Sequence, residues 1–219
     1  MSIQEAYLTP NKYSRPGIPM KQVKGIVIHY VGNPGSTAIA NRNYFNRLKD
    51  QNNTKPIYAS SHYIVGLEGE IIACVPEDEV AYHASKANGN HIGIEVCHPD
   101  GSGKFNCVTY EALIELIINI CKRHNLNPLR DINRHYDVTG KDCPSYYVKN
   151  VEAWEQLKQE VSDKMSISKI CIRLNGKIKW VDTVNVAGYN YIKLRDLEDQ
   201  HIKIGYDSEK KFPIIKVKI

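Results

Sequence analysis

The sequence predicts an α/β fold with a mixed central β-sheet flanked by helices, followed by a small β-rich C-terminal module. Short β-branched runs recur through the first 100 residues, and two long amphipathic helical patterns come after them. After Met165 the pattern changes to short strand-like pieces separated by turn signals. The 219 residues are enough for one domain of good size and one small appendage.

The first part of the chain carries the strand signals. Residues 1–24 are rich in Tyr, Pro and Lys, and we expect an extended arm there. The β-branched run Gly25–Tyr30 predicts a buried central strand, and residues 37–51 place apolar side chains on one helical face. Residues 61–66 and 70–75 flank a Leu-Glu-Gly turn, which predicts a β-hairpin.

A further strand and two helices complete this domain. Residues 91–97 predict another buried strand. Residues 109–124 carry the strongest helical stripe, and Thr109 is the expected N-cap. Residues 151–165 predict the last helix. The expected first domain therefore comprises residues 1–165.

The remaining residues, 168–219, are expected to form a separate module. The dipeptide Asn175-Gly176 between two strand-like runs is a strong hairpin signal, and residues 213–219 predict a last strand. At about 50 residues such a module has little core of its own, so docking or dimerisation is expected.

Composition and charge restrict the function classes. Hydrophobic residues make up 42% and charged residues 24%, the balance of a soluble globular protein, and no run reaches the ~20 apolar residues that span a bilayer. The net charge of +5 suits nucleic acid or a polyanionic cell wall. Because Lys and Arg form no tract and no nucleic-acid-binding motif occurs, we expect no nucleic-acid partner.

Leader and cysteine patterns indicate where the protein is made. The first 24 residues lack the apolar core of a signal peptide, so we expect cytoplasmic synthesis and no membrane association. The six cysteines are spread out without a CxxC pair, which favours reduced thiols over a disulfide framework.

Three residues suggest a metal site. His29 ends the first predicted strand, and His135 and Cys143 bracket a loop that can curl back on itself. Zinc accepts imidazole and thiolate ligands, and a catalytic zinc site uses three protein ligands with one open position. A lone histidine at a strand end is more often structural, and Cys143 alone could be an inert buried thiol. The spacing leaves both interpretations open.

Four segments in this order carry a family resemblance: Ile26–His29, Ser61–Tyr63, Ile92–Glu95 and His135–Pro144. Together they resemble the type 2 N-acetylmuramoyl-L-alanine amidase family, which includes amidase-type phage endolysins, autolysins and peptidoglycan recognition proteins. The H-x-D-x-x-x-K-x-C-P stretch is the most specific part, and the match covers about residues 20–162.

The resemblance implies that His29, His135 and Cys143 hold Zn²⁺. Recognition proteins that bind the wall without cutting it are similar but lack this cysteine, so Cys143 favours hydrolysis. A structural zinc protein would instead need four protein ligands and no open position.

The resemblance also implies catalytic roles for Glu95 and Lys141. Family members with the I-G-I-E segment use its Glu as the proposed acid/base, although strand alternation alone allows Glu95 to face either side. Lys141 lies two residues before Cys143, where its ammonium could stabilise an oxyanion, and the alternative is a solvated loop lysine.

Two further histidines are expected to bind substrate, namely His83 and His62, and either could be a structural histidine instead. Some family members place a catalytic Tyr where this chain has Ser61, and those members tend to lack the Glu. Because this chain has Ser61 in place of that Tyr, we expect Glu95 to carry out the proton transfer.

The expected function is that of a zinc-dependent amidase that cleaves the amide between N-acetylmuramic acid and L-alanine of bacterial peptidoglycan. A phage or prophage endolysin or an autolysin, acting on the wall after release, fits this expectation. The alternatives are a non-hydrolytic wall receptor and a cytoplasmic muropeptide-recycling amidase. The C-terminal module would bind the wall or form a homodimer.

Overall fold

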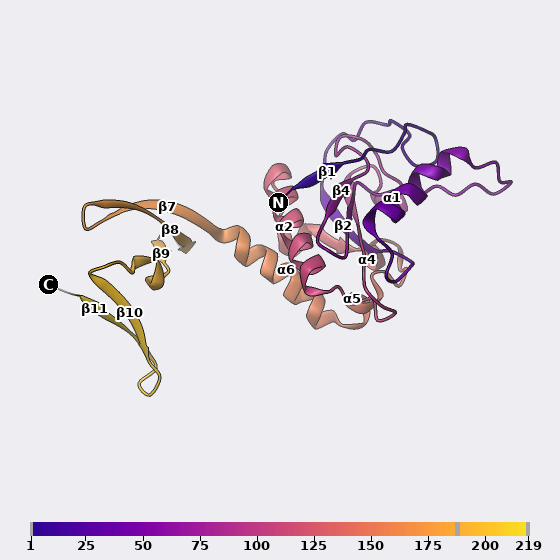
Figure 1. Ribbon diagram of the computed structural model, residues 1–219. Coiled ribbons are helices and arrows are strands. Elements are labelled where there is room, and N and C mark those ends of the chain that lie inside the picture. The colour runs from indigo at the N-terminus through magenta and orange to yellow at the C-terminus, as the bar shows by residue number, and fades with distance from the viewer. Residues whose placement is uncertain (1, 187–188, 218–219) are drawn as a thin grey trace. The chain divides into compact units, whose positions relative to one another are not determined.

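The computed structural model describes residues 2–186 and 189–217, which divide into two compact units, Met1–Ser162 and Asp163–Ile219 (Figure 1). The expected boundary lay between residues 165 and 168, a few residues further along the chain. Within the described ranges, none of the helices combines the length and the hydrophobicity that a bilayer-spanning segment requires.

The first unit is built on a mixed six-stranded sheet. Its strands are β1 (Ile3–Glu5), β2 (Gly25–Tyr30), β3 (Tyr63–Val65), β4 (Ile71–Ala73), β5 (His91–Val96) and β6 (Ile132–Arg134). They lie in the order β1-β4-β3-β5-β2-β6, with β3 and β4 antiparallel and all other neighbours parallel. The predicted mixed sheet is confirmed.

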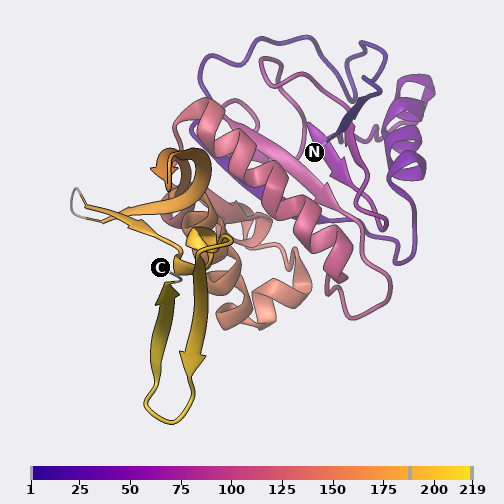
Figure 2. The ribbon, with the colours of Figure 1, turned by 60° about the vertical axis from the view of Figure 1, so that its left-hand side comes forward.

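Helices flank this sheet, as the sequence predicts. They are α1 (Ala38–Arg47), α2 (Cys107–His124), α3 (Pro128–Asp131), α4 (His135–Thr139), α5 (Ser145–Lys149) and α6 (Val151–Ser166), with short 3₁₀ turns at Leu48–Asp50 and Ser85–Ala87. Figure 2 shows α2 lying over one face of the sheet, roughly in line with its strands. The apolar stripe of α2 is buried, and Leu113, Leu116 and Ile117 are each 0% exposed.

The register of the central strands decides which side chains share a face. His29 of β2 is paired with Glu95 of β5, and Glu95 is paired with Ile64 of β3. Directly paired residues point to the same side of a sheet. Ile64 packs in one buried cluster with Phe45 and Leu48 from the α1 region. Helix α1 therefore covers the face from which His29 and Glu95 project.

The N-terminal arm contains a strand that the sequence analysis missed. Residues Ile3–Glu5 pair in parallel with β4, almost 70 residues further along the chain. The arm is also tied down by Arg15, whose guanidinium donates to the carboxylate of Glu79 at 2.8 and 2.6 Å. A three-residue strand gives no alternation signal of its own, so only tertiary pairing reveals it.

Helix α2 begins two residues before the predicted start. Its N-cap is Asn106, whose side-chain oxygen accepts a hydrogen bond from the Thr109 backbone N–H at 2.9 Å. The predicted cap at Thr109 is wrong: its hydroxyl instead donates to the Gly66 carbonyl oxygen at 2.8 Å. Both side chains therefore fasten the start of α2, since Asn106 also donates to the Leu67 carbonyl.

The second unit begins in the last turn of α6 and continues as antiparallel strands, with a 3₁₀ turn at Leu194–Leu197. Strands β7 (Ile167–Leu174), β8 (Lys177–Val186) and β9 (Tyr189–Ile192) form one sheet, and β10 (Ile202–Asp207) and β11 (Phe212–Val217) form a hairpin. Asn175 and Gly176 have φ values of 48° and 78°, which confirms the predicted two-residue turn. The last two residues of the predicted strand 213–219 lie outside the described residues.

Replacing the cap of α2 tests this account of its N-terminus. Asn106→Ala removes the hydrogen bonds to Thr109 N and Leu67 O, so the free energy of unfolding should fall by about 1–2 kcal/mol. Urea unfolding followed by circular dichroism measures this change. The exposed Glu111→Ala on the same helix is the matched control and should stay within about 0.5 kcal/mol. Equal effects of the two substitutions would contradict the capping role.

Candidate metal and catalytic site

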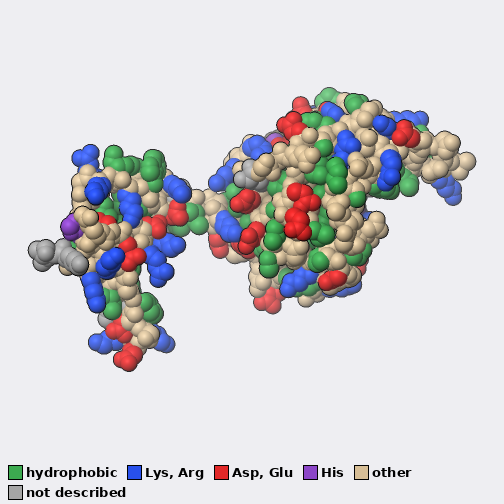
Figure 3. Space-filling view, in the orientation of Figure 1, with side chains coloured by type: hydrophobic (Ala, Val, Ile, Leu, Met, Phe, Trp, Pro, Cys, Tyr) green, Lys and Arg blue, Asp and Glu red, His purple; other side chains and the backbone are tan. Residues whose placement is uncertain are grey.

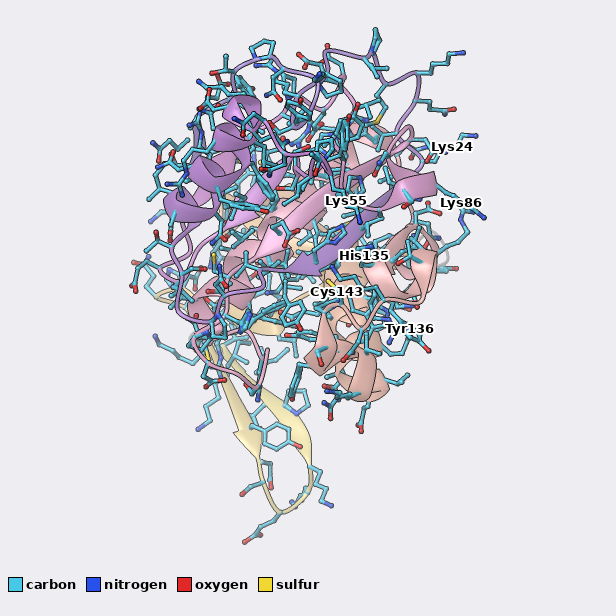
Figure 4. All side chains as sticks on the ribbon, turned by 90° about the vertical axis from the view of Figure 1, so that its right-hand side faces the viewer. Lys24, Lys55, Lys86, His135, Tyr136 and Cys143 are labelled. Atoms are coloured by element: carbon cyan, nitrogen blue, oxygen red, sulfur yellow. The ribbon has the colours of Figure 1, made fainter. Side chains whose placement is uncertain are left out.

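The fold brings together the three residues expected to bind metal. His29 is the penultimate residue of β2, His135 is the first residue of α4, and Cys143 precedes the start of α5. His29 Nδ1 lies 3.0 Å from His135 Nδ1 and 4.0 Å from Cys143 Sγ, and all three ligand atoms lie within 4.8 Å of one another. Figure 4 shows His135 and Cys143 beside each other at this site.

The spacing of the three ligand atoms suits a tetrahedral ion. Zn–N and Zn–S bonds of ordinary length place two nitrogens about 3.3 Å apart and a nitrogen and a sulfur about 3.5 Å apart. The observed separations of 3.0 and 4.0 Å bracket these values. His29 and Cys143 are each 2% exposed, so the group has little competing water. Two imidazoles and one thiol are a donor set that fits zinc with one position open.

Backbone hydrogen bonds hold the loop that carries two of these residues. Tyr136 N–H donates to the Cys143 carbonyl at 3.0 Å, which closes the loop and brings the ligand residues together. Asp137 accepts hydrogen bonds from the Arg134 backbone N–H at 2.8 Å and from its guanidinium at 2.7 Å. Asp137 thus caps the first turn of α4, on which His135 lies.

Burial determines the protonation state of the two most enclosed candidate ligands, His29 and Cys143. Burial, with further contributions from His83, His135 and Lys141, holds the pKa of His29 well below its usual range. The imidazole is therefore neutral at neutral pH and can offer a lone pair. Burial and the nearby carboxyl of Glu95 raise the pKa of the Cys143 thiol to about 12. A cation beside the sulfur is needed to stabilise its thiolate.

Glu95 faces the same cavity as the three ligand residues. The cavity has a volume of about 210 Å³, and Lys141 also lines it. Glu95 Oε2 is buried and has no hydrogen-bond partner among the described residues. Burial raises the pKa of Glu95 to about 8, and Lys141 opposes the rise. Strand alternation left the direction of this side chain open, and the pairing with His29 decides it.

The cavity continues toward a groove beside α1. A neighbouring depression of about 600 Å³ shares Glu95 and Lys141 with it and extends along α1 past Asn41 and Tyr44. Sequence reasoning missed most of the aromatic lining. The aromatic residues of the cavity are Tyr30, Phe45, Tyr58 and Tyr82. Tyr58 lies in a loop without a motif, whereas Tyr82 directly precedes His83, which was the one available signal.

The two histidines expected to contact substrate have different surroundings. His83 lines the cavity, and its Nδ1 lies 3.2 Å from His29 Nε2. His62 is 0% exposed; its Nε2 donates to the Glu79 carbonyl at 2.9 Å, and its Nδ1 accepts from Gly93 N–H at 2.9 Å. With both ring nitrogens bonded to backbone, His62 has no free polar group for a substrate, so we assign it a structural role instead.

Comparison with known proteins identifies a family match within the first unit and relatives that cover most of this chain. The family model described as N-acetylmuramoyl-L-alanine amidase matches residues 19–146. The N-acetylmuramoyl-L-alanine amidase BlyA of Bacillus subtilis (strain 168) is 35% identical over 181 residues, 74% of this chain and 47% of BlyA. CwlL of Bacillus licheniformis, with the same enzyme name, is 30% identical over 96% of this chain and 61% of its own. The chain thus spans about half to three fifths of these relatives.

A phage protein and solved structures extend the comparison. The endolysin of Enterobacteria phage T3 is 31% identical over 108 residues, 47% of this chain and 68% of the endolysin. The catalytic domain of XlyA superposes with a TM-score of 0.60 at 26% identity, over 74% of this chain and 99% of that domain. The PlyG catalytic domain superposes with a TM-score of 0.62 at 20% identity, over 75% and 96%, which supports the fold alone.

The raised pKa of Glu95 predicts that the free energy of unfolding of the metal-free protein decreases as pH rises. The folded state keeps a proton that the unfolded chain releases above its pKa of 4.5, so stability falls as pH rises from 4.5 to about 8. Glu95→Gln removes this loss. In chelator, the variant should match the wild type near pH 4.5 and exceed it by up to about 3 kcal/mol at pH 7.

Urea unfolding at a series of pH values measures this difference. The exposed Glu111→Gln serves as a control for a general change in charge. A constant difference between wild type and Glu95→Gln across this pH range would show that the carboxyl is not held protonated by burial.

Proposed function

The chain belongs to the N-acetylmuramoyl-L-alanine amidase family, and we propose on this basis that it is a zinc-dependent hydrolase of bacterial peptidoglycan. The bond cleaved is the amide between N-acetylmuramic acid and L-alanine. The observation that carries the proposal is the position of Glu95 in one cavity with His29, His135 and Cys143, with its buried Oε2 lacking a hydrogen-bond partner among the described residues. A wall receptor without hydrolysis has no use for such a costly group.

His29, His135 and Cys143 would hold the zinc ion. Zinc bound there supplies a Lewis acid that polarises the scissile carbonyl and lowers the pKa of water at the open position. The protein contributes two imidazoles, of which His29 is kept neutral by burial, and a sulfur atom excluded from bulk water. Loop closure between Tyr136 and Cys143 orders the ligands in advance, which reduces the entropy lost on binding.

Glu95 is the proposed acid/base. Its carboxylate takes the proton of the attacking water and passes it to the leaving amide nitrogen. Burial raises the pKa of Glu95 to about 8. A nearby cation would lower this pKa and so favour the ionised carboxylate, which can accept a proton. Ser61 cannot substitute for it, because its hydroxyl is 0% exposed and donates to the Tyr63 carbonyl at 2.9 Å.

Lys141 is the proposed oxyanion stabiliser. Its side chain is exposed and lines both the cavity and the groove, and its backbone carbonyl accepts from Cys143 N–H at 2.7 Å. This bond fixes the start of the lysine side chain close to the ligand sulfur. A positive charge there favours the negative charge that develops on the carbonyl oxygen in the tetrahedral intermediate.

The second unit is proposed to hold the enzyme on the wall. Residues 163–219 contain 12 Lys/Arg and 7 Asp/Glu, whereas residues 1–162 contain 17 of each, so the whole net charge of +5 belongs to the second unit. Figure 3 shows Lys and Arg side chains on its visible surface. Trp180 and Tyr191 are 66% and 60% exposed on one face of the β7–β8–β9 sheet, while Val181 is buried on the other.

Basic charge beside exposed aromatic rings suits an anionic polysaccharide better than a second copy of the same basic unit, because two such units repel each other. We therefore favour wall binding over homodimerisation for this unit. In the cell, we propose an endolysin or autolysin that acts on the wall after release, as the names of several relatives suggest for those proteins.

Release of new N-terminal alanine from purified peptidoglycan tests the activity. The wild type should release alanine, chelator should abolish release, and added zinc should restore it. Cys143→Ser should lose activity and zinc together. Glu95→Gln should keep bound zinc but lose activity by at least about 100-fold, and Lys141→Ala by about 10- to 1,000-fold.

Zinc content measured on the same preparations separates binding from chemistry. Glu111→Gln provides a control away from the cavity. A wild-type protein that sediments with the wall yet releases no alanine would overturn the amidase proposal in favour of a receptor. Release from soluble muropeptides but not from intact wall would indicate a recycling enzyme.

Wall retention by the second unit is tested with the full-length chain. The double variant Trp180→Ala/Tyr191→Ala should weaken co-sedimentation with purified wall by about tenfold or more, because exposed aromatic residues dominate such interfaces. Tyr7→Ala, an exposed aromatic residue of the first unit, is the control. Unchanged sedimentation, or a wild-type dimer that the double variant converts to a monomer, would contradict wall binding by this face.

A further inference from the structure

A chain of hydrogen bonds joins the metal ligand His29 to the backbone of β5 through His83. His83 Nε2 lies 3.1 Å from the carbonyl oxygen of His91, the first residue of β5. His83 Nδ1 lies 3.2 Å from His29 Nε2, and the other ring nitrogen of His29 lies 3.0 Å from His135 Nδ1. The His83 ring therefore connects the His91 carbonyl to His29, and the His29 ring connects His83 to His135.

The carbonyl oxygen at one end decides where the protons lie. A carbonyl oxygen only accepts hydrogen bonds, so His83 Nε2 carries a proton and donates to His91. The other nitrogen of a neutral imidazole is an acceptor, so His83 Nδ1 accepts from His29 Nε2–H. His29 Nδ1 is then left unprotonated, with its lone pair toward His135 and Cys143.

We propose that His83 is a positioning residue that sets the tautomer and the ring orientation of His29, so that His29 Nδ1 is the metal-binding atom. This role rests on the proposed zinc site. It differs from the expected contact between His83 and substrate, which would need a free ring nitrogen. Both nitrogens of His83 are already engaged.

The surroundings of His83 hold it in this position. Asn88 Oδ1 accepts hydrogen bonds from the backbone N–H groups of His83 at 2.9 Å and Ala84 at 2.7 Å. The ring lies over Gly93, where a Cβ atom would come within 2.4 Å of His83 Cγ. Gly93 is also held through its N–H, which donates to His62 Nδ1. His62 therefore supports the surface on which His83 packs.

Three substitutions separate the hydrogen bonds of His83 from its bulk. In His83→Asn, the amide oxygen can take the place of Nδ1 and still accept from His29. In His83→Gln, the amide nitrogen can take the place of Nε2 and donate to His91, but no acceptor faces His29. His83→Phe keeps a ring and removes both bonds. Thermal unfolding in chelator confirms that each variant is folded before use.

Zinc affinity, measured by competition with a chromophoric chelator, is the first readout. Loss of the partner of a ligand histidine typically weakens metal binding by about 10- to 100-fold. We expect this loss for His83→Gln and His83→Phe, and a loss of less than about threefold for His83→Asn. Equal affinity of all variants and wild type, or an Asn variant as weak as the Phe variant, would overturn the positioning role.

The second readout is the tautomer of His29 in the metal-free wild type, from long-range ¹H–¹⁵N NMR correlations of its ring. The expected state has the proton on Nε2, and His83→Phe should give a mixture of tautomers. A proton on Nδ1 in the wild type overturns the proposal. If wild type itself binds no zinc, the proposed function fails as well; if it binds zinc and the variants bind equally, only the role of His83 fails.

Discussion

The parallel pairing of β2 with β5 is the constraint on which the site depends. It places His29 directly beside Glu95, and a slip of one residue would turn one of the two side chains to the opposite face. Ile26, Ile28, Ile92 and Ile94 alternate to the opposite face and are each 0% exposed, so a slip that turned them around is excluded. The face of His29 and Glu95 receives α1 through Phe45 and Leu48, and α4 brings His135 to it. The hydrophobic core thus determines the geometry of the polar site.

With the strand register fixed, burial determines the protonation states of the groups in the cavity. The cavity keeps His29 neutral, keeps Cys143 as a thiol and raises the pKa of Glu95. In the metal-free protein, burial of Glu95 lowers stability at neutral pH, and its Oε2 has no hydrogen-bond partner among the described residues. A bound cation would favour the ionised forms of both the Cys143 thiol and the Glu95 carboxyl. Metal binding and folding stability are therefore expected to be coupled at this site. The strain is concentrated where the proposed reaction takes place.

The two units divide the electrostatics of the chain. The first unit is neutral overall, and the groups of its candidate site lie in a cavity that opens into the groove beside α1. The second unit carries the net positive charge on antiparallel strands with exposed aromatic rings such as Trp180. Under the proposed function, long-range attraction to an anionic wall is separated from the chemistry, where extra positive charge would disturb the candidate ligand histidines.

The sequence by itself determined the elements and the chemical parts. Alternation and helical periodicity are local, so the central strands, α2, α6 and the Asn175-Gly176 turn could be predicted. The motif around Cys143 predicted which residues form the candidate metal site. Only the tertiary structure decided which groups meet: the pairing of β1 with β4, the direction of Glu95, and the bonded state of His62. Those outcomes depend on partners more than 15 residues away, and no local pattern records them.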